Sequence, residues 1–391
     1  MKKILFVTGD LHSSGVTTSM INYIDELSKK KDLKIDLLLD KNKGDYVNNI
    51  SKDINIYEVT YSKEYFNHRL KLREAKSKLN IFSFIIYFII KVLYILCDKL
   101  FTNNIIDNYV IKKINNKLDK YDLVIDFLGY GYYLSKFVAI NFKDTKKIMF
   151  IHGEQLELFK KTEKYFKYFD NFACVSYYLK DKFENYFPDT KGRCVVIYNL
   201  IDDERVRNLA NKECELTKLY SLTKLVTVGR LSQEKGYDLV IDSASILKSN
   251  NIEFKWFIIG NGYLEEELSK LIHDKELDDY VILMGLKKNP YPYIKNCDIY
   301  VQTSRHEGFG ITIAEAKILN KAIVSTNLGS IREQIDDNVN GLLCNIDSSD
   351  IASSIMELIK DKDKVKLFEN NLKKFKFSNK EQIDKLISLI D

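Results

Sequence analysis

The chain has 391 residues, of which 45% are hydrophobic and 29% are charged. This much apolar material can form a sizeable core, so the composition excludes a mainly disordered chain. The 60 basic and 55 acidic residues leave a net charge of +5, which does not by itself argue for a nucleic-acid partner. At about 100–200 residues per domain, the length predicts two domains.

The first residues indicate a buried strand rather than a secretion signal. The start MKKILFVTGD places four apolar residues before Gly9, whereas the apolar core of a signal peptide is longer. The six cysteines form no CxxC pair, so the spacing of a zinc site or a dithiol redox motif is absent. We therefore expect a cytoplasmic protein whose thiols are buried and reduced.

Short apolar runs alternate with helical stretches along the chain. In the first half, a helix is expected at 20–29, and strands are expected at 4–7, 35–39, 122–126, 147–151, 171–175 and 194–197. In the second half, strands are expected at 224–228, 256–259, 281–284, 299–302 and 322–325, with helices at 238–249, 264–274, 291–296 and 312–319. This alternation predicts parallel sheets covered by helices on both faces.

A polar stretch at 199–223 separates the two series of strands. We therefore expect an N-terminal domain over 1–199 and a C-terminal domain over 200–375. The tail from residue 361 is rich in lysine and helical in pattern. Its last part, 376–391, is predicted to form a helix that packs back on the first domain.

One segment, 63–100, interrupts the alternation. Residues 63–78 hold six Lys or Arg against two Glu, and residues 79–96 are strongly apolar with their polar members three or four apart. That spacing predicts a helix with a wide apolar face. Two interpretations stay open, a helix packed on protein and a helix lying in a membrane interface. A spanning helix is disfavoured because the run is shorter than about 20 residues and contains Lys91.

Two glutamates with seven residues between them lie in the run TSRHEGFGITIAE, where a Gly308-Phe309-Gly310 turn leads into an apolar helix. Glycines let backbone N–H groups approach a ligand, and a helix N-terminus favours a phosphate. Glu315, on the first turns of that helix, can accept hydrogen bonds from a vicinal diol such as a ribose. Glu307, before the turn, would face the reacting end. On spacing alone, ordinary surface glutamates remain an alternative.

A second cluster follows an apolar strand and precedes a helix. Its cations, Arg230 and Lys235, can converge on one diphosphate, since Arg offers a planar fork and Lys a compact charge. Cations placed there stabilise a departing nucleoside diphosphate without a metal. Judged alone, these residues could equally be two solvated cations on a loop. The acidic pair Asp361 and Asp363 does not suit a metal, because it lies in the charged tail.

These segments together resemble glycosyltransferase family 4, the retaining GT-B enzymes that include bacterial surface-polysaccharide transferases. The resemblance covers nearly all of the second half, through GRLSQEKG, IIGNGY, CDIYVQTSRHEGFGITIAEA and STNLGSIREQI. It is looser in the first half, at Gly15 in SSGVTTSMINYI and at Ile151-His152-Gly153. The first loop has one glycine where many members have two, and Asn320-Lys321 replaces a common Gly-containing pair.

The resemblance implies an α/β protein of the GT-B fold, with two Rossmann-like, doubly wound parallel-sheet domains facing across a cleft. It implies a hexosyltransferase that moves a hexose or N-acetylhexosamine from a nucleotide-sugar, with UDP favoured, and retains the anomeric configuration. The acceptor would be a glycan or a lipid-linked glycan in cell-surface synthesis. Neither a metal nor another cofactor is expected, because the family generally needs no divalent cation.

The resemblance also assigns roles to individual residues. Glu307, His152, Arg230 and Lys235 would form the catalytic set, with Glu307 near the anomeric carbon and His152 reaching in from the first domain. The donor would be bound by Gly15, Arg230, Lys235, Gly308, Phe309, Gly310, Ile311 and Glu315. Within that set, Arg230 and Lys235 would hold the diphosphate and Glu315 the ribose hydroxyls.

Two other classes of function stay open. Glu307 and Glu315 could be the carboxylate pair of a retaining glycoside hydrolase, although this hypothesis leaves Arg230 and Lys235 without a role. A non-catalytic GT-B partner of another transferase is the second alternative, and such a protein would be expected to lose some of these four residues. Contact with the inner face of the cell membrane is expected through 63–100, and no nucleic-acid partner is expected.

Overall fold

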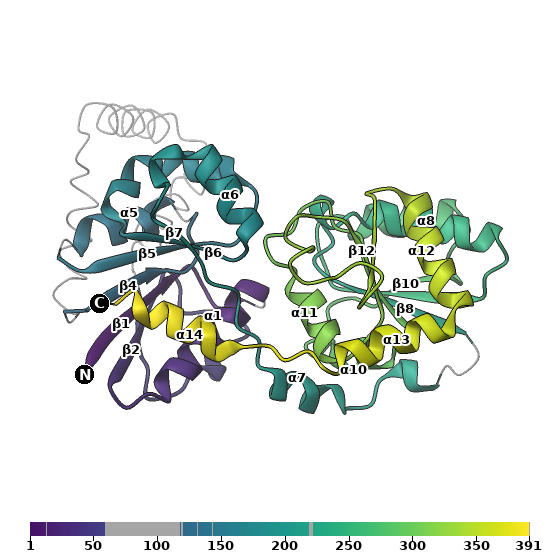
Figure 1. Cartoon of the computed structure of the whole chain (residues 1–391), viewed down its shortest axis with the longest axis horizontal. Helices are drawn as coiled ribbons and strands as arrows, with labels where there is room; N and C mark the ends of the chain where they lie inside the picture. Colours follow the sequence, from purple (N-terminus) through teal and green to yellow (C-terminus); the bar gives the residue numbers. More distant parts are fainter. Residues whose placement is uncertain are drawn as a thin grey trace, which may run out of the picture.

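A computed structural model of the chain describes residues 1–12, 14–58, 118, 120–130, 132–142, 144–218 and 222–390. It consists of two lobes, each built on one sheet, which lie side by side along the long axis of the molecule (Figure 1). The basic and apolar segment 63–100, with the helix expected at 79–96, lies outside the described residues. In the part of the chain that is described, no helix is both long and apolar enough to cross a membrane.

The N-terminal lobe is built on a seven-stranded sheet with the order β3-β2-β1-β4-β5-β6-β7. Its strands are β1 (Lys2–Thr8), β2 (Leu33–Leu39), β3 (Asn55–Glu58), β4 (Leu123–Asp126), β5 (Lys146–Ile151), β6 (Asn171–Cys174) and β7 (Cys194–Val196). All neighbouring strands pair in parallel. In Figure 1, α5 (Tyr132–Asn141) and α6 (Tyr177–Tyr186) lie above β5 and β6, whereas α1 (Gly15–Ser28) and α14 (Asn379–Ser388) lie lower, beside β1 and β2.

The C-terminal lobe is built on a six-stranded sheet with the order β10-β9-β8-β11-β12-β13, which is also parallel throughout. Its strands are β8 (Thr223–Val228), β9 (Phe254–Ile259), β10 (Val281–Leu283), β11 (Ile299–Gln302), β12 (Ile323–Thr326) and β13 (Leu342–Cys344). Its helices are α8 (Tyr237–Ser249), α9 (Glu265–Asp274), α10 (Tyr291–Asn296), α11 (Ile311–Ile318), α12 (Ser348–Lys360) and α13 (Lys362–Leu372). The predicted fold class, two doubly wound parallel-sheet lobes, is confirmed.

Each of the expected strands appears within two residues of its predicted bounds, because each is a continuous apolar run that the sheet buries. Two strands were missed, the partly exposed edge strand β3 and the short strand β13, which is no shorter than the predicted β7 and β10. The charged tail is not one helix, since residues 373–378 separate α13 from α14.

The chain passes between the lobes twice, after β7 and after α13 (Figure 1). The second passage delivers α14 to the N-terminal lobe, where Ile383, Leu386 and Ile390 join the hydrophobic core. The Gln382 side chain accepts a hydrogen bond from the backbone N–H of Tyr198 at 2.9 Å. The end of the chain is therefore an integral part of the first lobe.

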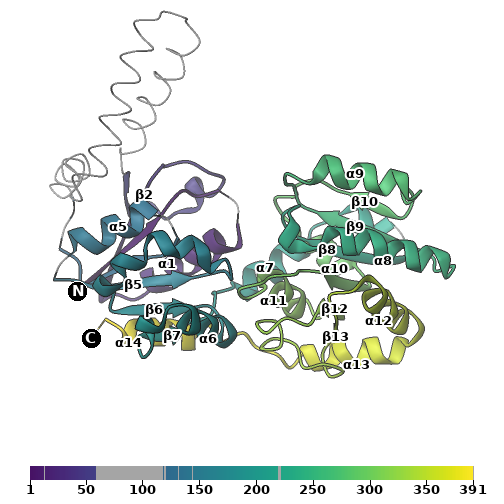
Figure 2. The same ribbon diagram turned by 90° about the horizontal axis from the view of Figure 1, so that it is seen from above.

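The lobes also meet at a junction beside α7 (Asp203–Ala210) and α11 (Figure 2). The carboxylate of Glu333, from the C-terminal lobe, accepts hydrogen bonds from the backbone N–H groups of Tyr177 at 3.0 Å and Tyr178 at 2.7 Å. These two N–H groups begin helix α6, and such groups have no partner inside their own helix. Glu333 therefore supplies from one lobe an acceptor that the other lobe needs.

Replacing Leu386 with Ala should lower the free energy of unfolding by about 2–5 kcal/mol, because the side chain is fully buried and leaves a cavity. Urea-induced unfolding followed by circular dichroism measures this change. Lys380→Ala on the exposed face of the same helix is the control, and should change stability by less than about 0.5 kcal/mol. Equal stability of the two variants would contradict the docking of α14 on the first lobe.

Candidate functional site between the two lobes

Two loops of the C-terminal lobe carry most of the predicted site residues. They run over 229–236 and 303–310 and follow β8 and β11, which are neighbours in the sheet. The strand order reverses between these two strands, since β9 and β10 lie beyond β8, whereas β12 and β13 lie beyond β11. In open parallel sheets, ligands bind at such a reversal, outside the carboxyl ends of the strands. The position of the loops therefore favours a binding site.

Gly236 and Gly310 end the two loops and precede the helices α8 and α11. Both have positive φ angles, of 65° and 82°, which other residues rarely adopt. A Cβ atom on Gly236 would also lie 2.3 Å from the carbonyl oxygen of Thr303. The loops therefore approach each other so closely that only glycine fits at this point.

An ion pair between Lys235 and Glu307 joins the two loops. Nζ of Lys235 lies 2.6 Å from Oε1 of Glu307, and the two side chains are 22% and 9% exposed. The same carboxylate oxygen accepts hydrogen bonds from Nε2 of Gln302 at 2.9 Å and from Oγ of Ser304 at 2.7 Å. The structure thus brings together two residues predicted at the site, one from each loop.

Glu315 lies on α11 and is buried. Burial raises the pKa of its carboxyl group to about 7, and the hydrogen bond from the Tyr291 hydroxyl, at 3.1 Å, opposes this rise. The group is therefore poised to ionise near neutral pH. Glu315 and Glu307 share no hydrogen-bond partner among the described residues.

Arg230 is exposed at the start of the first loop. Across the junction, burial raises the pKa of the Tyr130 hydroxyl, and the cation of Arg230 acts in the opposite direction. The cation of Arg230 therefore lies close enough to act on a hydroxyl group of the N-terminal lobe.

His152 follows β5 and reaches the site mainly through its backbone. Its ring stacks on Phe150, with centroids 5.5 Å apart, and Nε2 lies 2.8 Å from the carbonyl oxygen of Phe127. A carbonyl only accepts, so Nε2 carries the proton and Nδ1 is an acceptor, which is buried without a partner. Burial lowers the pKa of the imidazole to about 4, so the ring is neutral at pH 7.

Glycines bring the backbones of the two lobes together. A Cβ atom on Gly308 would lie 2.0 Å from the carbonyl oxygen of His152, and one on Gly15 would lie 2.8 Å from Cδ1 of Ile311. The hydroxyl of Ser176 donates to the carbonyl oxygen of Gly308 at 2.8 Å. The loop that contains Gly15 and the glycine turn are therefore neighbours, as their joint assignment to a donor site requires.

Phe309 directs its ring away from the predicted ligand. The ring is buried in the core of the N-terminal lobe, 5.4 Å from that of Tyr198 and 6.3 Å from that of Phe377. Any contact of Phe309 with a donor would therefore be made by its backbone. Gln334 hydrogen-bonds the carbonyl oxygens of Phe309 and Gly310, which holds the turn from behind.

Sequence reasoning missed a carboxylate that lies in the site. Glu154 is 4% exposed, and its Oε1 accepts a hydrogen bond from the backbone N–H of Glu307 at 3.1 Å. Its Oε2 pairs with Nζ of Lys182 at 2.5 Å. Glu154 directly follows His152 and Gly153, and this position in the sequence was the one signal that could have identified it. Gln302, Ser304 and Tyr291 were also missed, and nothing in their spacing distinguishes them.

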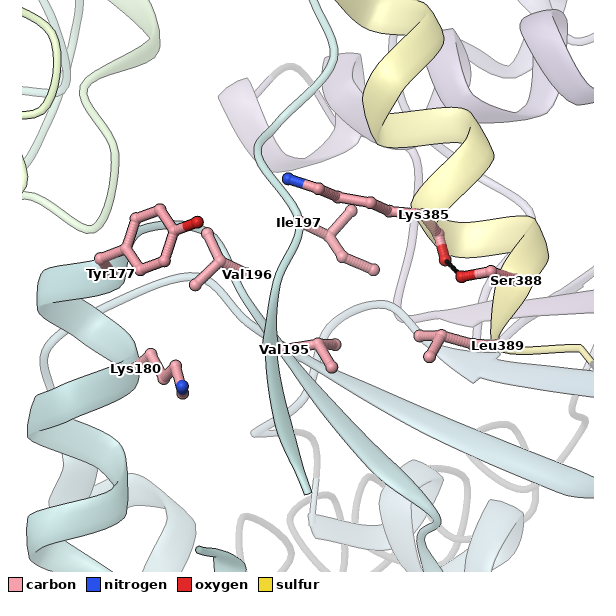
Figure 3. A pocket seen from close by; sticks show the side chains of 8 residues that line it. All are labelled: Tyr177, Lys180, Val195, Val196, Ile197, Lys385, Ser388 and Leu389. Atoms are coloured by element: carbon pink, nitrogen blue, oxygen red, sulfur yellow. Dashed lines mark hydrogen bonds between the residues drawn. The ribbon is translucent and has the colours of Figure 1, made fainter. Parts of the chain in front are cut away.

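A separate pocket of about 250 Å³ lies where β7 meets α6 and α14. Figure 3 shows Tyr177 and Lys180 on α6, with Lys385 and Leu389 on the far side of β7. None of the predicted site residues lines this pocket, so it is distinct from the site between the lobes.

Residues 220–375, which include both loops, match the family of glycosyl transferases group 1. The N-acetylgalactosamine-N,N'-diacetylbacillosaminyl-diphospho-undecaprenol 4-alpha-N-acetylgalactosaminyltransferase of Campylobacter jejuni is 30% identical over 197 residues, which cover 50% of this chain and 52% of that protein. The poly(ribitol-phosphate) alpha-N-acetylglucosaminyltransferase of Staphylococcus aureus is 28% identical over 279 residues, covering 68% and 54%. The chain spans about half the length of these relatives.

The whole chain superimposes on a crystal structure of an S. aureus TarM mutant, solved with fondaparinux, alpha-GlcNAc-glycerol and UDP. The TM-score is 0.73 at 18% identity, and the alignment covers 100% of both chains. This likeness shows the fold, which is GT-B. The segment that carries Arg230, Lys235, Glu307 and Glu315 thus matches the group 1 glycosyl transferases, and the described part of the chain has the GT-B fold.

Proposed function

We propose that the chain is a retaining glycosyltransferase that moves a hexose or N-acetylhexosamine from a nucleotide-sugar to a hydroxyl group. The observation that carries the proposal is the ion pair of Lys235 and Glu307, which joins two loops at the strand-order reversal of the lobe that matches group 1 glycosyl transferases. UDP is the favoured nucleotide because the similar TarM structure contains it. The names of both relatives favour an N-acetylhexosamine.

The diphosphate of the donor is assigned to Arg230, Lys235 and the backbone of the glycine turn. Two cations offset the charge that develops on the departing nucleoside diphosphate, so the reaction needs no metal or other cofactor. The N-terminus of α11 lies behind Gly308, Phe309 and Gly310, and its N–H groups, beginning with Ile311, favour a phosphate. Charge and position therefore support this part of the assignment.

The sugar and the nucleoside are assigned to the two glutamates. Glu307 would place its carboxylate near the anomeric carbon, where positive charge develops as the bond to the diphosphate breaks. Glu315 would accept hydrogen bonds from the ribose hydroxyls. His152 would act from the N-terminal lobe, where its backbone carbonyl lies against Gly308, and Gly15 lets its loop pack closely against Ile311.

The acceptor is proposed to be a glycan on a lipid carrier at the inner face of the cell membrane. One relative is named for a diphospho-undecaprenol substrate, and the sequence of 63–100 combines a basic run with an apolar one. Basic segments next to apolar faces bind anionic membranes in a salt-dependent way. Flotation with anionic vesicles tests this proposal, and no binding at low salt would contradict it.

Lys235→Ala and Glu307→Ala should each lower transfer from a UDP-sugar at least about 100-fold, since each removes a charge that acts in the transition state. Chromatography of the released UDP and of the glycosylated acceptor measures the rate, and NMR of the product gives the anomeric configuration. Lys270→Ala, an exposed cation on α9, is the control and should keep full activity.

Full activity in either site variant would contradict the assignment. Release of sugar from a glycoside without any nucleotide would indicate a hydrolase instead. A protein that stays folded but transfers no sugar from any donor would favour the non-catalytic partner.

The affinity for UDP should rise about tenfold between pH 6 and pH 8, in addition to the change caused by ionisation of the UDP phosphate. The pKa of Glu315 is about 7, so its ionised fraction rises from about one tenth to nine tenths over this range. Only the ionised form can accept both ribose hydroxyls fully. Calorimetric titration of the wild type and Glu315→Gln isolates the effect, because both share the phosphate titration. An equal pH dependence of the two proteins would contradict the assignment of Glu315.

A further inference from the structure

Gln302 ends β11 directly behind the Lys235–Glu307 ion pair, and its side chain is almost fully buried, at 1% exposed. A buried primary amide needs an acceptor for its nitrogen and a donor for its oxygen. Neighbouring residues of the site meet both needs, and one of them is Glu307.

The hydrogen bonds fix the orientation of the amide. Its oxygen accepts from the hydroxyls of Tyr300 at 2.8 Å and Thr312 at 3.2 Å. Its nitrogen donates to Oγ of Ser304 at 2.7 Å and to Oε1 of Glu307 at 2.9 Å. A flipped amide would place its oxygen 2.9 Å from a carboxylate oxygen, and two acceptors repel each other. The buried Tyr300 hydroxyl thus holds the N–H group toward Glu307.

Glu307 uses its two oxygens differently. Oε1 receives three donors, the cation of Lys235 and the neutral groups of Gln302 and Ser304. Oε2 makes no hydrogen bond to any residue that the structure describes. One oxygen is therefore anchored to the lobe, and the other is free for a ligand.

A bound diphosphate would compete for the Lys235 amine, because it carries more negative charge than one carboxylate. Once the amine turns to the phosphate, only neutral donors hold Oε1. Neutral donors keep the carboxylate in place without cancelling its charge, which suits a group that stabilises positive charge on the sugar.

We infer that Gln302 is a positioning residue, which holds Oε1 of Glu307 when Lys235 turns to the diphosphate and so keeps Oε2 available to the sugar. The inference rests on the proposed function for the identity of the ligand. The anchoring itself can be tested without any ligand.

The kinetic test uses Gln302→Met, which has nearly the same size and lacks the donor. Its kcat should fall about 10- to 100-fold, the usual cost of losing a hydrogen bond to a charged group, while the dissociation constant for UDP stays unchanged. Tyr300→Phe should lower kcat less, and the double variant should be no worse than Gln302→Met alone. Ser243→Ala, another buried donor in this lobe, is the control and should leave kcat unchanged.

Additive losses in the double variant, or a matching rise in the dissociation constant for UDP, would mean that Gln302 only supports the fold. Tyr300→Phe keeps its ring in the core, so it provides the same test if Gln302→Met does not fold.

Crystal structures of two further variants test the anchoring directly. In Lys235→Ala, the Glu307 carboxylate should remain within hydrogen-bond distance of Gln302. In Lys235→Ala combined with Gln302→Met, only Ser304 still donates to the carboxylate, which should lose its fixed position. A carboxylate that moves in the first variant, or stays in place in both, would overturn the inference. Absence of transfer by the wild type would refute the proposed function alone, since these structures need no turnover.

Discussion

The site depends on the close approach of two loops at the carboxyl ends of β8 and β11. Gly236 allows one loop to touch the other, and this contact lets Lys235 reach Glu307 at 2.6 Å. A partly buried ion pair gives little net stability, because both groups lose water when they pair. The pair is therefore better explained by a ligand that needs its cation and its carboxylate than by the needs of the fold.

The glycine turn is held from both lobes. On the side of the C-terminal lobe, Gln302 and Ser304 anchor the Glu307 side chain. On the other side, Glu154 accepts from the Glu307 backbone N–H, and Ser176 donates to Gly308. A change in the arrangement of the two lobes would therefore alter these contacts.

Much of the fold followed from local patterns, because the central strands are short, continuous apolar runs that a parallel sheet buries on both faces. The strand β3 escaped prediction because none of its residues is fully buried, so its sequence is not an apolar run. In the site, Glu307 and Lys235 lie in motifs that the family resemblance singled out, because spacing alone left other interpretations open. Glu154 acts through a residue 153 positions away, and no local pattern encodes such a contact.

The side chains that support the site were hidden for the same reason. Gln302 looks like an ordinary strand residue, and Tyr291 like part of a short helix. Their importance comes from burial and from the direction of their hydrogen bonds, which only the folded chain defines. Sequence reasoning therefore predicted the charged groups of the candidate site, but not the neutral groups that hold them in place.

The most direct measurement of the central proposal is the thermal stability of the protein with UDP, GDP and ADP, in the presence of a chelator. A ligand that binds only the folded state adds about 2.7 kcal/mol of stability at a hundred times its dissociation constant. We expect a selective rise with UDP that Lys235→Ala abolishes. Unchanged stability with every nucleotide, or a rise that survives Lys235→Ala, would contradict a nucleotide-sugar site between the two lobes.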